Sequence, residues 1–217
     1  MGLLKLLFPP KCVLCGSILE RDEQDICAEC RNDAPVCPGG KGDMPFIKGT
    51  CSVWYYEDDV RKSILRYKFG NRRAYARSYA NFLAKKLKEE YPEGFDVLTW
   101  VPISPLRKLR RGFDQVQMLA NALAPQLGLQ PVRMLKKTRH NRPQSGISDA
   151  SHRRANVLGA YRVIQPELLW GKRVLLLDDV ITTGATAGEC ARVLLTAGAR
   201  EVYVGTVAAV RHNAKIK

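Results

Sequence analysis

The sequence predicts an α/β protein with a parallel-sheet core that has helices on both faces, preceded by a small cysteine-rich module. Short, almost continuously apolar runs, such as residues 97–101 and 174–177, are typical of strands buried on both faces. Longer stretches with apolar residues at helical spacing separate these runs, which is the pattern of βαβ units. A chain of 217 residues has room for one domain of ordinary size and a small appendage.

The charge balance indicates anionic partners. The chain has 35 Lys and Arg residues against 21 Asp and Glu, which gives a formal net charge of +14. A pyrophosphate-bearing sugar, single-stranded nucleic acid and an acidic protein surface all fit this charge. The charge therefore does not choose between them.

The apolar start of the chain does not have the features of an export signal. It stops at Pro9 and Pro10 and continues directly into a cysteine motif, without a cleavage site of small residues. No stretch approaches the roughly 18 apolar residues that a membrane span needs. We therefore expect a soluble, cytoplasmic protein with no membrane insertion.

Two Cys-x-x-Cys pairs near the start of the chain predict a structural zinc site. The four cysteines are Cys12, Cys15, Cys27 and Cys30. Disulfides are the alternative, but thiols stay reduced in the cytosol, and residues 11–42 are too poor in apolar side chains to fold without a metal. Four thiolates fill a tetrahedral site, so the metal is not expected to be catalytic. Cys37 could substitute as a ligand, whereas Cys51 and Cys190 fall in an expected strand and helix as core residues.

A segment rich in proline and glycine, residues 35–45, has the composition of a linker. We therefore predict two parts, a zinc-binding amino-terminal module with its linker over residues 1–45 and a main domain over residues 46–217.

The first half of the main domain alternates strand and helix patterns. Alternating apolar residues predict a strand over 50–57, and a short basic helix follows over 60–69. A long helix is expected over 73–91, because apolar residues recur at helical spacing until Pro92. The next strand, 97–101, is apolar except for Thr99.

The loop after this strand contains hydroxyl and cationic groups that suit a pyrophosphate. The residues concerned are Pro102, Ile103, Ser104, Arg107, Lys108, Arg110 and Arg111. Ligands gather at the carboxyl ends of parallel strands, so this loop should border the loop that follows Leu177. The alternative is that the basic run is only the exposed first part of the helix that continues through Phe113 to Leu123.

Two further segments complete the middle of the domain. A strand is expected over 131–135. The basic, polar stretch 136–154 follows it and has no apolar periodicity, which predicts a mobile loop of the kind that often serves as a lid.

The run from Val174 to Thr186 carries the strongest functional signal. A buried strand is followed by Asp178 and Asp179, then by a threonine-rich loop at the start of a helix expected over 187–197. The loop residues are Thr182, Thr183, Gly184, Ala185 and Thr186. A helix N-terminus favours a phosphate, and carboxylates suit sugar hydroxyls, directly or through a cation, so the run predicts a ribose 5-phosphate site.

This run has two other interpretations. A P-loop is excluded, because the chain has no G-x-x-x-x-G-K-[ST] string and places an acidic pair where that loop needs a lysine. An ordinary strand, turn and helix, with aspartates that cap neighbouring N–H groups, is the remaining alternative.

This run resembles the fingerprint of the type I phosphoribosyltransferases, in which four apolar residues precede an acidic pair and a Thr-Thr-Gly-x-Thr loop. The resemblance implies the type I phosphoribosyltransferase fold, phosphoribosyl pyrophosphate as ligand and magnesium as its cation. It also implies that Asp178 and Asp179 hold the ribose hydroxyls and help to place the magnesium. Arg139 and Arg142, in the loop predicted to be mobile, would assist the leaving group.

The four-cysteine module, the string from Arg111 to Gln115 and the basic loop with Gln144 extend the resemblance to the whole chain, which is similar to the ComF family. That family combines a zinc finger with this transferase domain and is associated with natural transformation, the handling of single-stranded DNA after it enters the cytoplasm. It usually has asparagine where Asp114 stands. The resemblance implies a phosphoribosyltransferase-like protein of unknown acceptor, with DNA-uptake proteins as candidate partners.

The alternative is a single-stranded-DNA-binding competence protein in which the transferase site is a sensor or an inactive remnant. Aromatic side chains interleaved with cations favour it, because they could stack on bases and contact phosphates. These residues are Tyr55, Tyr56, Arg66, Tyr67, Lys68 and Phe69. A half-buried helix face would have the same pattern.

Overall fold

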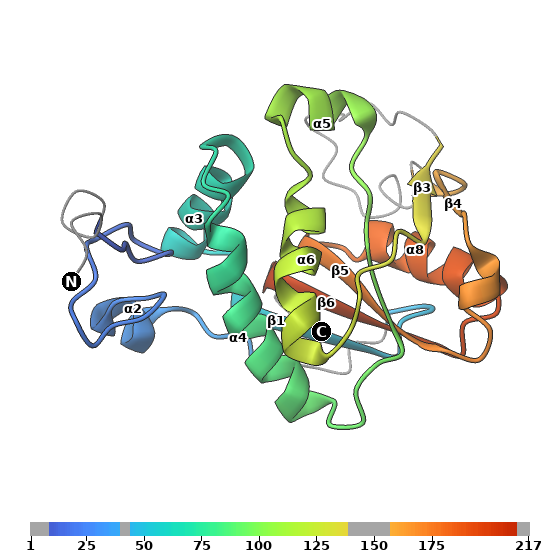
Figure 1. Cartoon of the computed structure of the whole chain (residues 1–217), viewed down its shortest axis with the longest axis horizontal. Helices are drawn as coiled ribbons and strands as arrows, with labels where there is room; N and C mark the ends of the chain where they lie inside the picture. Colours follow the sequence, from blue (N-terminus) through green and yellow to red (C-terminus); the bar gives the residue numbers. More distant parts are fainter. Residues whose placement is uncertain (1–8, 40–43, 139–156, 212–217) are drawn as a thin grey trace, which may run out of the picture.

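The computed structural model describes residues 9–39, 44–138 and 157–211 (Figure 1). In chain order the elements are α2 (Ala28–Asp33), β1 (Gly49–Tyr55), α3 (Asp58–Phe69), α4 (Tyr75–Glu90), β2 (Val97–Trp100), α5 (Pro105–Arg111), α6 (Gln115–Leu127), β3 (Leu135–Lys137), β4 (Tyr161–Val163), the 3-10 helix η1 (Pro166–Leu168), β5 (Arg173–Ile181), α8 (Ala185–Thr196) and β6 (Glu201–Ala209).

A four-stranded parallel sheet forms the centre of the molecule, with the strand order β1-β6-β5-β2. The carboxyl ends of β2 and β5 are neighbours, because Trp100 pairs with Leu177 and the N–H of Val101 donates to the Leu177 carbonyl at 2.9 Å. This register places the loop after β2 beside the acidic pair, as expected from the sequence.

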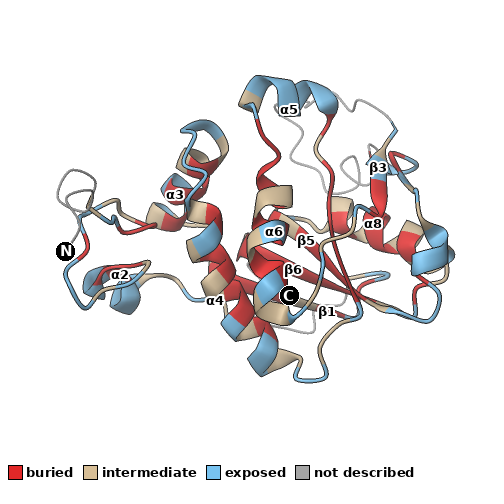
Figure 2. Cartoon of the chain, viewed as in Figure 1, coloured by how far each residue is buried: buried red, intermediate tan, exposed pale blue. Residues whose placement is uncertain are grey.

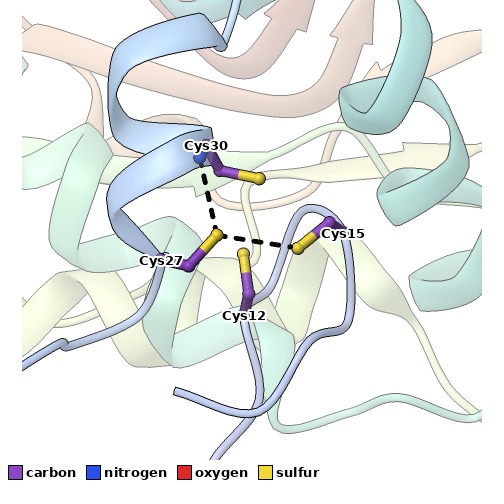
Figure 3. Close-up of side chains that lie close together, drawn as sticks. All are labelled: Cys12, Cys15, Cys27 and Cys30. Atoms are coloured by element: carbon purple, nitrogen blue, oxygen red, sulfur yellow. Dashed lines mark hydrogen bonds between the residues drawn. The ribbon is translucent and has the colours of Figure 1, made fainter. Parts of the chain in front are cut away.

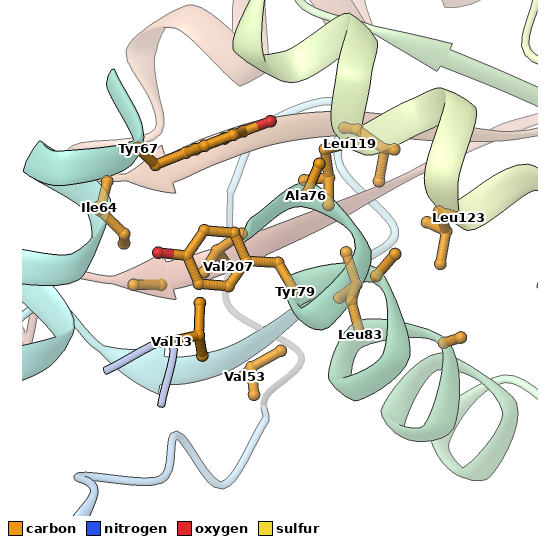
Figure 4. Close-up of a cluster of buried hydrophobic side chains, with 14 of the residues drawn as sticks. Val13, Val53, Ile64, Tyr67, Ala76, Tyr79, Leu83, Leu119, Leu123 and Val207 are labelled. Atoms are coloured by element: carbon orange, nitrogen blue, oxygen red, sulfur yellow. The ribbon is translucent and has the colours of Figure 1, made fainter. Parts of the chain in front are cut away.

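Helices cover both faces of this sheet, which confirms the predicted architecture (Figure 2). Leu175 and Leu177 of β5 pack in one buried cluster with α3, α4 and α6 (Figure 4). Val174 and Leu176, whose side chains alternate to the other face, pack in a second cluster with α8. A strand buried in this way on both faces has to be apolar throughout, and that is why it was visible in the sequence.

The cysteine module packs directly against the main domain beside α3 and α4 (Figure 1). Val13 and Leu14 are each 1 % exposed and share their buried cluster with Ile64 of α3 and Tyr79 of α4. The module and the sheet therefore share one core, and the boundary after residue 45 stays a prediction.

The acidic pair lies inside β5 and not after it, which corrects the expected end of the strand at residue 177. The pairing with β6 continues from Asp178 opposite Thr206 to Ile181 opposite Ala209. Backbone pairing continues through polar residues, so the hydrophobic pattern alone placed the strand end too early.

The strand expected over 131–135 is also displaced. Pro131 makes only an isolated bridge to Leu98, and β3 starts at Leu135 and pairs antiparallel with β4. Lys136 and Lys137 therefore belong to a strand and not to the loop expected over 136–154. Residues 139–154 of that loop lie outside the described residues.

The basic run after β2 forms a separate short helix, α5, and is not the first part of α6. Gly112 ends α5 with a left-handed backbone, φ 75°, and its N–H donates to the Lys108 carbonyl at 2.8 Å. Asp114 then starts α6 as its N-cap, accepting from the N–H groups of Val116 and Gln117 at 3.1 Å each. The glycine between the two helices allows α5 to project above the sheet (Figure 1).

The core predicts a clear contrast between two leucines. Leu119 of α6 is fully buried, whereas Leu109 of α5 is 80 % exposed. We expect Leu119→Ala to lower the free energy of unfolding by about 2–5 kcal/mol and Leu109→Ala to change it by less than about 0.5 kcal/mol. Urea denaturation followed by circular dichroism measures both, and equal effects would contradict this packing.

Candidate functional site

The four predicted zinc ligands converge on one point of the amino-terminal module. The sulfur atoms of Cys12, Cys15, Cys27 and Cys30 all lie within 4.8 Å of one another (Figure 3). Gly16 has a left-handed backbone, φ 89°, directly after the first pair, and the Cys27 sulfur accepts from the N–H of Cys30 at the start of α2.

The separation of the sulfurs fits a tetrahedral zinc site. Zinc–sulfur bonds of about 2.3 Å in a tetrahedron place the sulfurs roughly 3.8 Å apart. The sulfurs of Cys15 and Cys27 are 3.7 Å apart. Burial raises the pKa of Cys12 and of Cys30, so a cation is needed to hold these thiols as thiolates. Four such ligands leave no open position, which is typical of a structural metal.

The other cysteines lie apart from this cluster. Cys37 does not belong to it among the described residues, and Lys86 donates to the Cys37 carbonyl. Cys51 in β1 and Cys190 in α8 are both fully buried, which confirms the core positions predicted for them.

Asp179 faces α3 and α6, where two donors hold its carboxylate. The Lys68 ammonium lies 2.7 Å from Oδ1, and the Gln115 side-chain amide donates to Oδ2 at 2.9 Å. The ion pair is nearly buried, with 17 % of the Lys68 side chain and 11 % of the Asp179 side chain exposed. Water screens such a pair weakly, so the ion pair with Lys68 holds the Asp179 side chain in place.

Asp178 lies on the α8 side, near Cys190 and Tyr161, because successive side chains of a strand point to opposite faces. Its Oδ1 accepts from the N–H of Asp179 at 2.8 Å. Burial and the neighbouring Asp179 carboxylate raise the pKa of Asp178 to about 7. Without a cation or hydroxyl ligand, this acid therefore changes its charge near neutral pH.

The threonine-rich loop leads from β5 into the N-terminus of α8. Gly184, at the N-cap, has φ 72° and provides no side-chain cap for the helix. A Cβ on this glycine would come 2.6 Å from the Met44 sulfur, so both the backbone and the space around it favour glycine. Thr182, Thr183 and the first turn of α8 with Ala185 and Thr186 thus surround a helix N-terminus, as expected for a phosphate site.

The loop after β2 contributes both anchoring and charge. Pro102 is buried, Ile103 is half-buried, and buried Ser104 caps α5 by accepting from the Arg107 N–H at 3.3 Å. The Arg107 side chain is exposed. Burial lowers the pKa of Lys137 in β3 and the nearby Arg107 charge lowers it further, whereas the Asp178 carboxylate raises it, so these three charged groups lie near one another.

The sequence does not predict that three of these residues lie near the acidic pair. It predicts Lys68 in a group that could contact bases, gives Gln115 only as part of a family string, and predicts Lys137 in a loop. Lys68 and Gln115 come from elements far from β5 in the chain, so no local pattern signals their contact with Asp179.

Asp114 is a helix cap whose pKa is raised by burial. Arg139 and Arg142 lie outside the described residues.

Among the described residues, no helix is long and apolar enough to cross a membrane.

Comparison with solved structures finds phosphoribosyltransferase folds with partial overlap. Over 65 % of the chain it is similar to the glutamine phosphoribosylpyrophosphate amidotransferase from B. subtilis, at 25 % identity and a TM-score of 0.44. It is also similar to an adenine phosphoribosyltransferase, at 14 % identity over 65 % of the chain and a TM-score of 0.41. The chain spans 30 % of the amidotransferase and 82 % of the adenine enzyme.

Family comparisons cover both parts of the chain. Residues 114–217 match the phosphoribosyl transferase domain family, and residues 3–48 match the double zinc ribbon domain family. With the parallel sheet and the four-cysteine cluster, these matches define a protein of the type I phosphoribosyltransferase fold with an amino-terminal zinc ribbon.

Full-length relatives name the family. Competence protein F of Haemophilus influenzae is 30 % identical, with 90 % of this chain and 82 % of the relative aligned. Competence protein ComFC of Streptococcus pneumoniae is 28 % identical over 88 % of this chain and 96 % of the relative, and DNA utilization protein YhgH of Salmonella typhi is 30 % identical over 92 % and 96 %. The chain belongs to the ComF family.

The raised pKa of Asp178 predicts how stability depends on pH in the ligand-free protein. Its folded-state pKa of about 7 lies above the ordinary value of 3.8, so the penalty of ionising it in the folded state grows as pH rises from about 4 to 7. We expect Asp178→Asn, measured by urea denaturation without magnesium, to stabilise the protein by about 1–3 kcal/mol at pH 8 and by less at pH 5. Asp22→Asn, at an exposed position, is the control. If Asp178→Asn stabilises the protein equally at pH 5 and pH 8, the raised pKa of Asp178 is wrong.

Proposed function

We propose that the protein binds phosphoribosyl pyrophosphate with magnesium at the carboxyl end of β5 and transfers the phosphoribosyl group to a nucleophilic acceptor. The observation that carries this proposal is the continuity of the acidic pair with the loop that starts α8, because one short segment then presents both carboxylates and a helix N-terminus. An anion at the helix N-terminus and hydroxyls at the carboxylates are the two ends of a ribose 5-phosphate.

Each part of this segment has a role in binding. The backbone N–H groups at the start of α8 and the hydroxyls of Thr182, Thr183 and Thr186 donate to the 5-phosphate. Asp178 and Asp179 accept from the ribose hydroxyls. Their carboxylate oxygens also suit magnesium, which, when bound, neutralises charge on the pyrophosphate.

The pyrophosphate is the leaving group, so cations should surround it. When the C1–oxygen bond breaks, positive charge grows on the ribose and negative charge on the leaving pyrophosphate. Arg107 at the start of α5 and Lys137 in β3 are cationic groups near Asp178 and can stabilise that negative charge. Arg139 and Arg142 would act from the segment that joins β3 to β4, and Ser104 would hold the loop after β2 in place.

The relatives connect this chemistry with DNA. They are named competence and DNA utilization proteins, which favours a cytoplasmic role in natural transformation, with DNA-uptake proteins as partners. The zinc ribbon of residues 1–45, joined to the transferase domain of residues 46–217, would stabilise the amino-terminal part of the fold and offer a surface to such partners.

Isothermal titration tests the binding proposal. We expect phosphoribosyl pyrophosphate to bind the wild type in magnesium and to bind Asp178→Asn/Asp179→Asn roughly 100-fold more weakly, because two charge-assisted contacts are lost. Asp22→Asn should bind like the wild type. No binding by the wild type, or equal binding by the double variant, would refute the proposal.

The transfer step needs a separate assay. Mass spectrometry after incubation with phosphoribosyl pyrophosphate, magnesium and a panel of bases, nucleotides, ammonia and single-stranded DNA identifies the product. Pyrophosphate release that depends on one of these acceptors supports an enzyme. Binding without release favours the second candidate, in which the site is a sensor or an inactive remnant of a single-stranded-DNA-binding protein.

One contact specifically favours DNA binding. Phe69 at the end of α3 is 67 % exposed, and the Arg111 guanidinium of α5 lies 4.8 Å from the centre of its ring. An exposed aromatic ring beside an arginine can stack on a base and contact a phosphate. Two members of the predicted group are less suited, since Tyr67 is 1 % exposed and Lys68 is paired with Asp179. Tyr67 thus belongs to a half-buried helix face.

Fluorescence anisotropy with labelled oligothymidine tests this surface. We expect Phe69→Ala to weaken binding roughly 5- to 100-fold, and the affinity of the wild type to fall steeply with salt. Trp170→Ala is the matched control, because Trp170 is also an exposed aromatic, at 83 %, but lies beside η1. Binding that is lost equally in both variants, or no DNA retention at low salt, would rule out this candidate.

A further inference from the structure

Helix α3 touches the cysteine module with one part of its surface. Ser63 donates from its hydroxyl to the Val13 carbonyl, and Arg66 donates from its guanidinium to the Leu14 carbonyl. Val13 and Leu14 are the two residues between Cys12 and Cys15, and both are almost fully buried. The position of α3 therefore depends on the turn that brings the first two sulfurs together.

The last turn of the same helix touches the candidate sugar-phosphate site. The Tyr67 hydroxyl donates to the Gln115 carbonyl at 2.6 Å, and the adjacent Lys68 forms the 2.7 Å ion pair with Asp179. Tyr67 is fixed further by its ring contacts with Tyr79 and Phe113 (Figure 4 shows Tyr67 and Tyr79). One rigid helix of 12 residues thus lies between the metal ligands and the acidic pair.

Lys68 and Gln115 together hold both oxygens of Asp179. Gln115 is 3 % exposed, and within the described parts of the chain its Oε1 is a buried acceptor without a hydrogen-bond partner. Buried acceptors are rarely left unpaired in folded proteins. A donor from a ligand at Asp179, such as a sugar hydroxyl, would satisfy this oxygen.

We propose that Lys68 is a positioning residue of the sugar-phosphate site, and that α3 couples its position to the metal-binding turn of Cys12 and Cys15. Lys68 fixes one oxygen of Asp179 through its 2.7 Å ion pair, so that the remaining lone pairs point to the ligand. When the turn between the first two cysteines relaxes, α3 loses its contacts through Ser63 and Arg66, and the ion pair that Lys68 forms from the same last turn of the helix opens. The part of this inference that concerns the ligand rests on the proposed function.

Substitutions of Lys68 test its role at the site. We expect Lys68→Met to weaken binding of phosphoribosyl pyrophosphate in magnesium roughly 10- to 100-fold by isothermal titration, because Asp179 loses a charged partner. Lys68→Arg, which keeps the charge, should restore most of the affinity. Lys62→Met is the matched control, because Lys62 lies on the same helix but is 65 % exposed and pairs with Asp59.

Two results would overturn this role. One is Lys68→Met binding at least as tightly as the wild type, which would make Lys68 a competitor of the ligand for Asp179. The other is Lys68→Arg binding as weakly as Lys68→Met, which would make the residue merely structural.

Hydrogen exchange measured by mass spectrometry tests the coupling without any ligand. Arg66→Met should speed the exchange of residues 178–186 roughly tenfold, and removal of zinc from the wild type by a chelator should do the same. Arg61→Met, at an exposed position of α3, should leave exchange there unchanged. If neither Arg66→Met nor zinc removal alters exchange over 178–186, the coupling is wrong. Because this readout needs no phosphoribosyl pyrophosphate, its failure is distinct from failure of the proposed function.

Discussion

Two adjacent carboxylates at the end of a buried strand are the constraint on which the rest of this structure depends. Ionised acids next to each other repel, and burial increases the cost of both charges. The two acids have different partners in the fold. Asp179 pairs with the Lys68 ammonium and accepts from the Gln115 amide, whereas Asp178 accepts from the N–H of Asp179 and has its pKa raised to about 7. Asp179 is thus fixed by two partners, whereas the charge of Asp178 depends on pH near neutrality.

Holding Asp179 in this way requires elements that are distant in the chain. Lys68 comes from α3 and Gln115 from the first turn of α6, and Asp179 lies 64 residues beyond Gln115 in the chain. One buried cluster holds these elements together, and this cluster also includes Val13 and Leu14 from the cysteine module. The amino-terminal module is therefore continuous with the packing that supports the acidic pair. A metal bound by its four thiols would stabilise a part of the core, and its effect would not stop at the module.

Particular residues show where sequence reasoning succeeded and where it failed. The run from Val174 to Thr186 was interpretable because burial on both faces and a helix N-terminus each leave a local signature. The four cysteines were identified by their spacing, and their sulfurs do converge. The predicted end of β5 at residue 177 was wrong, because backbone pairing with β6 continues through Asp178 and Asp179. Lys136 and Lys137 were wrongly assigned to a loop, because a hairpin strand as short as β3 has no detectable periodicity.

The sequence by itself determined the fold class, the ComF family and the four-cysteine cluster, since all three depend on short patterns of adjacent residues. Only the tertiary structure decided which side chains surround the acidic pair. It placed Lys68 on Asp179 and not on a nucleic-acid surface, buried Tyr67, and separated α5 from α6 at Gly112. The physical reason is that an ion pair or a buried ring is defined by contacts between elements far apart in the chain, and such contacts leave no period or spacing in the sequence.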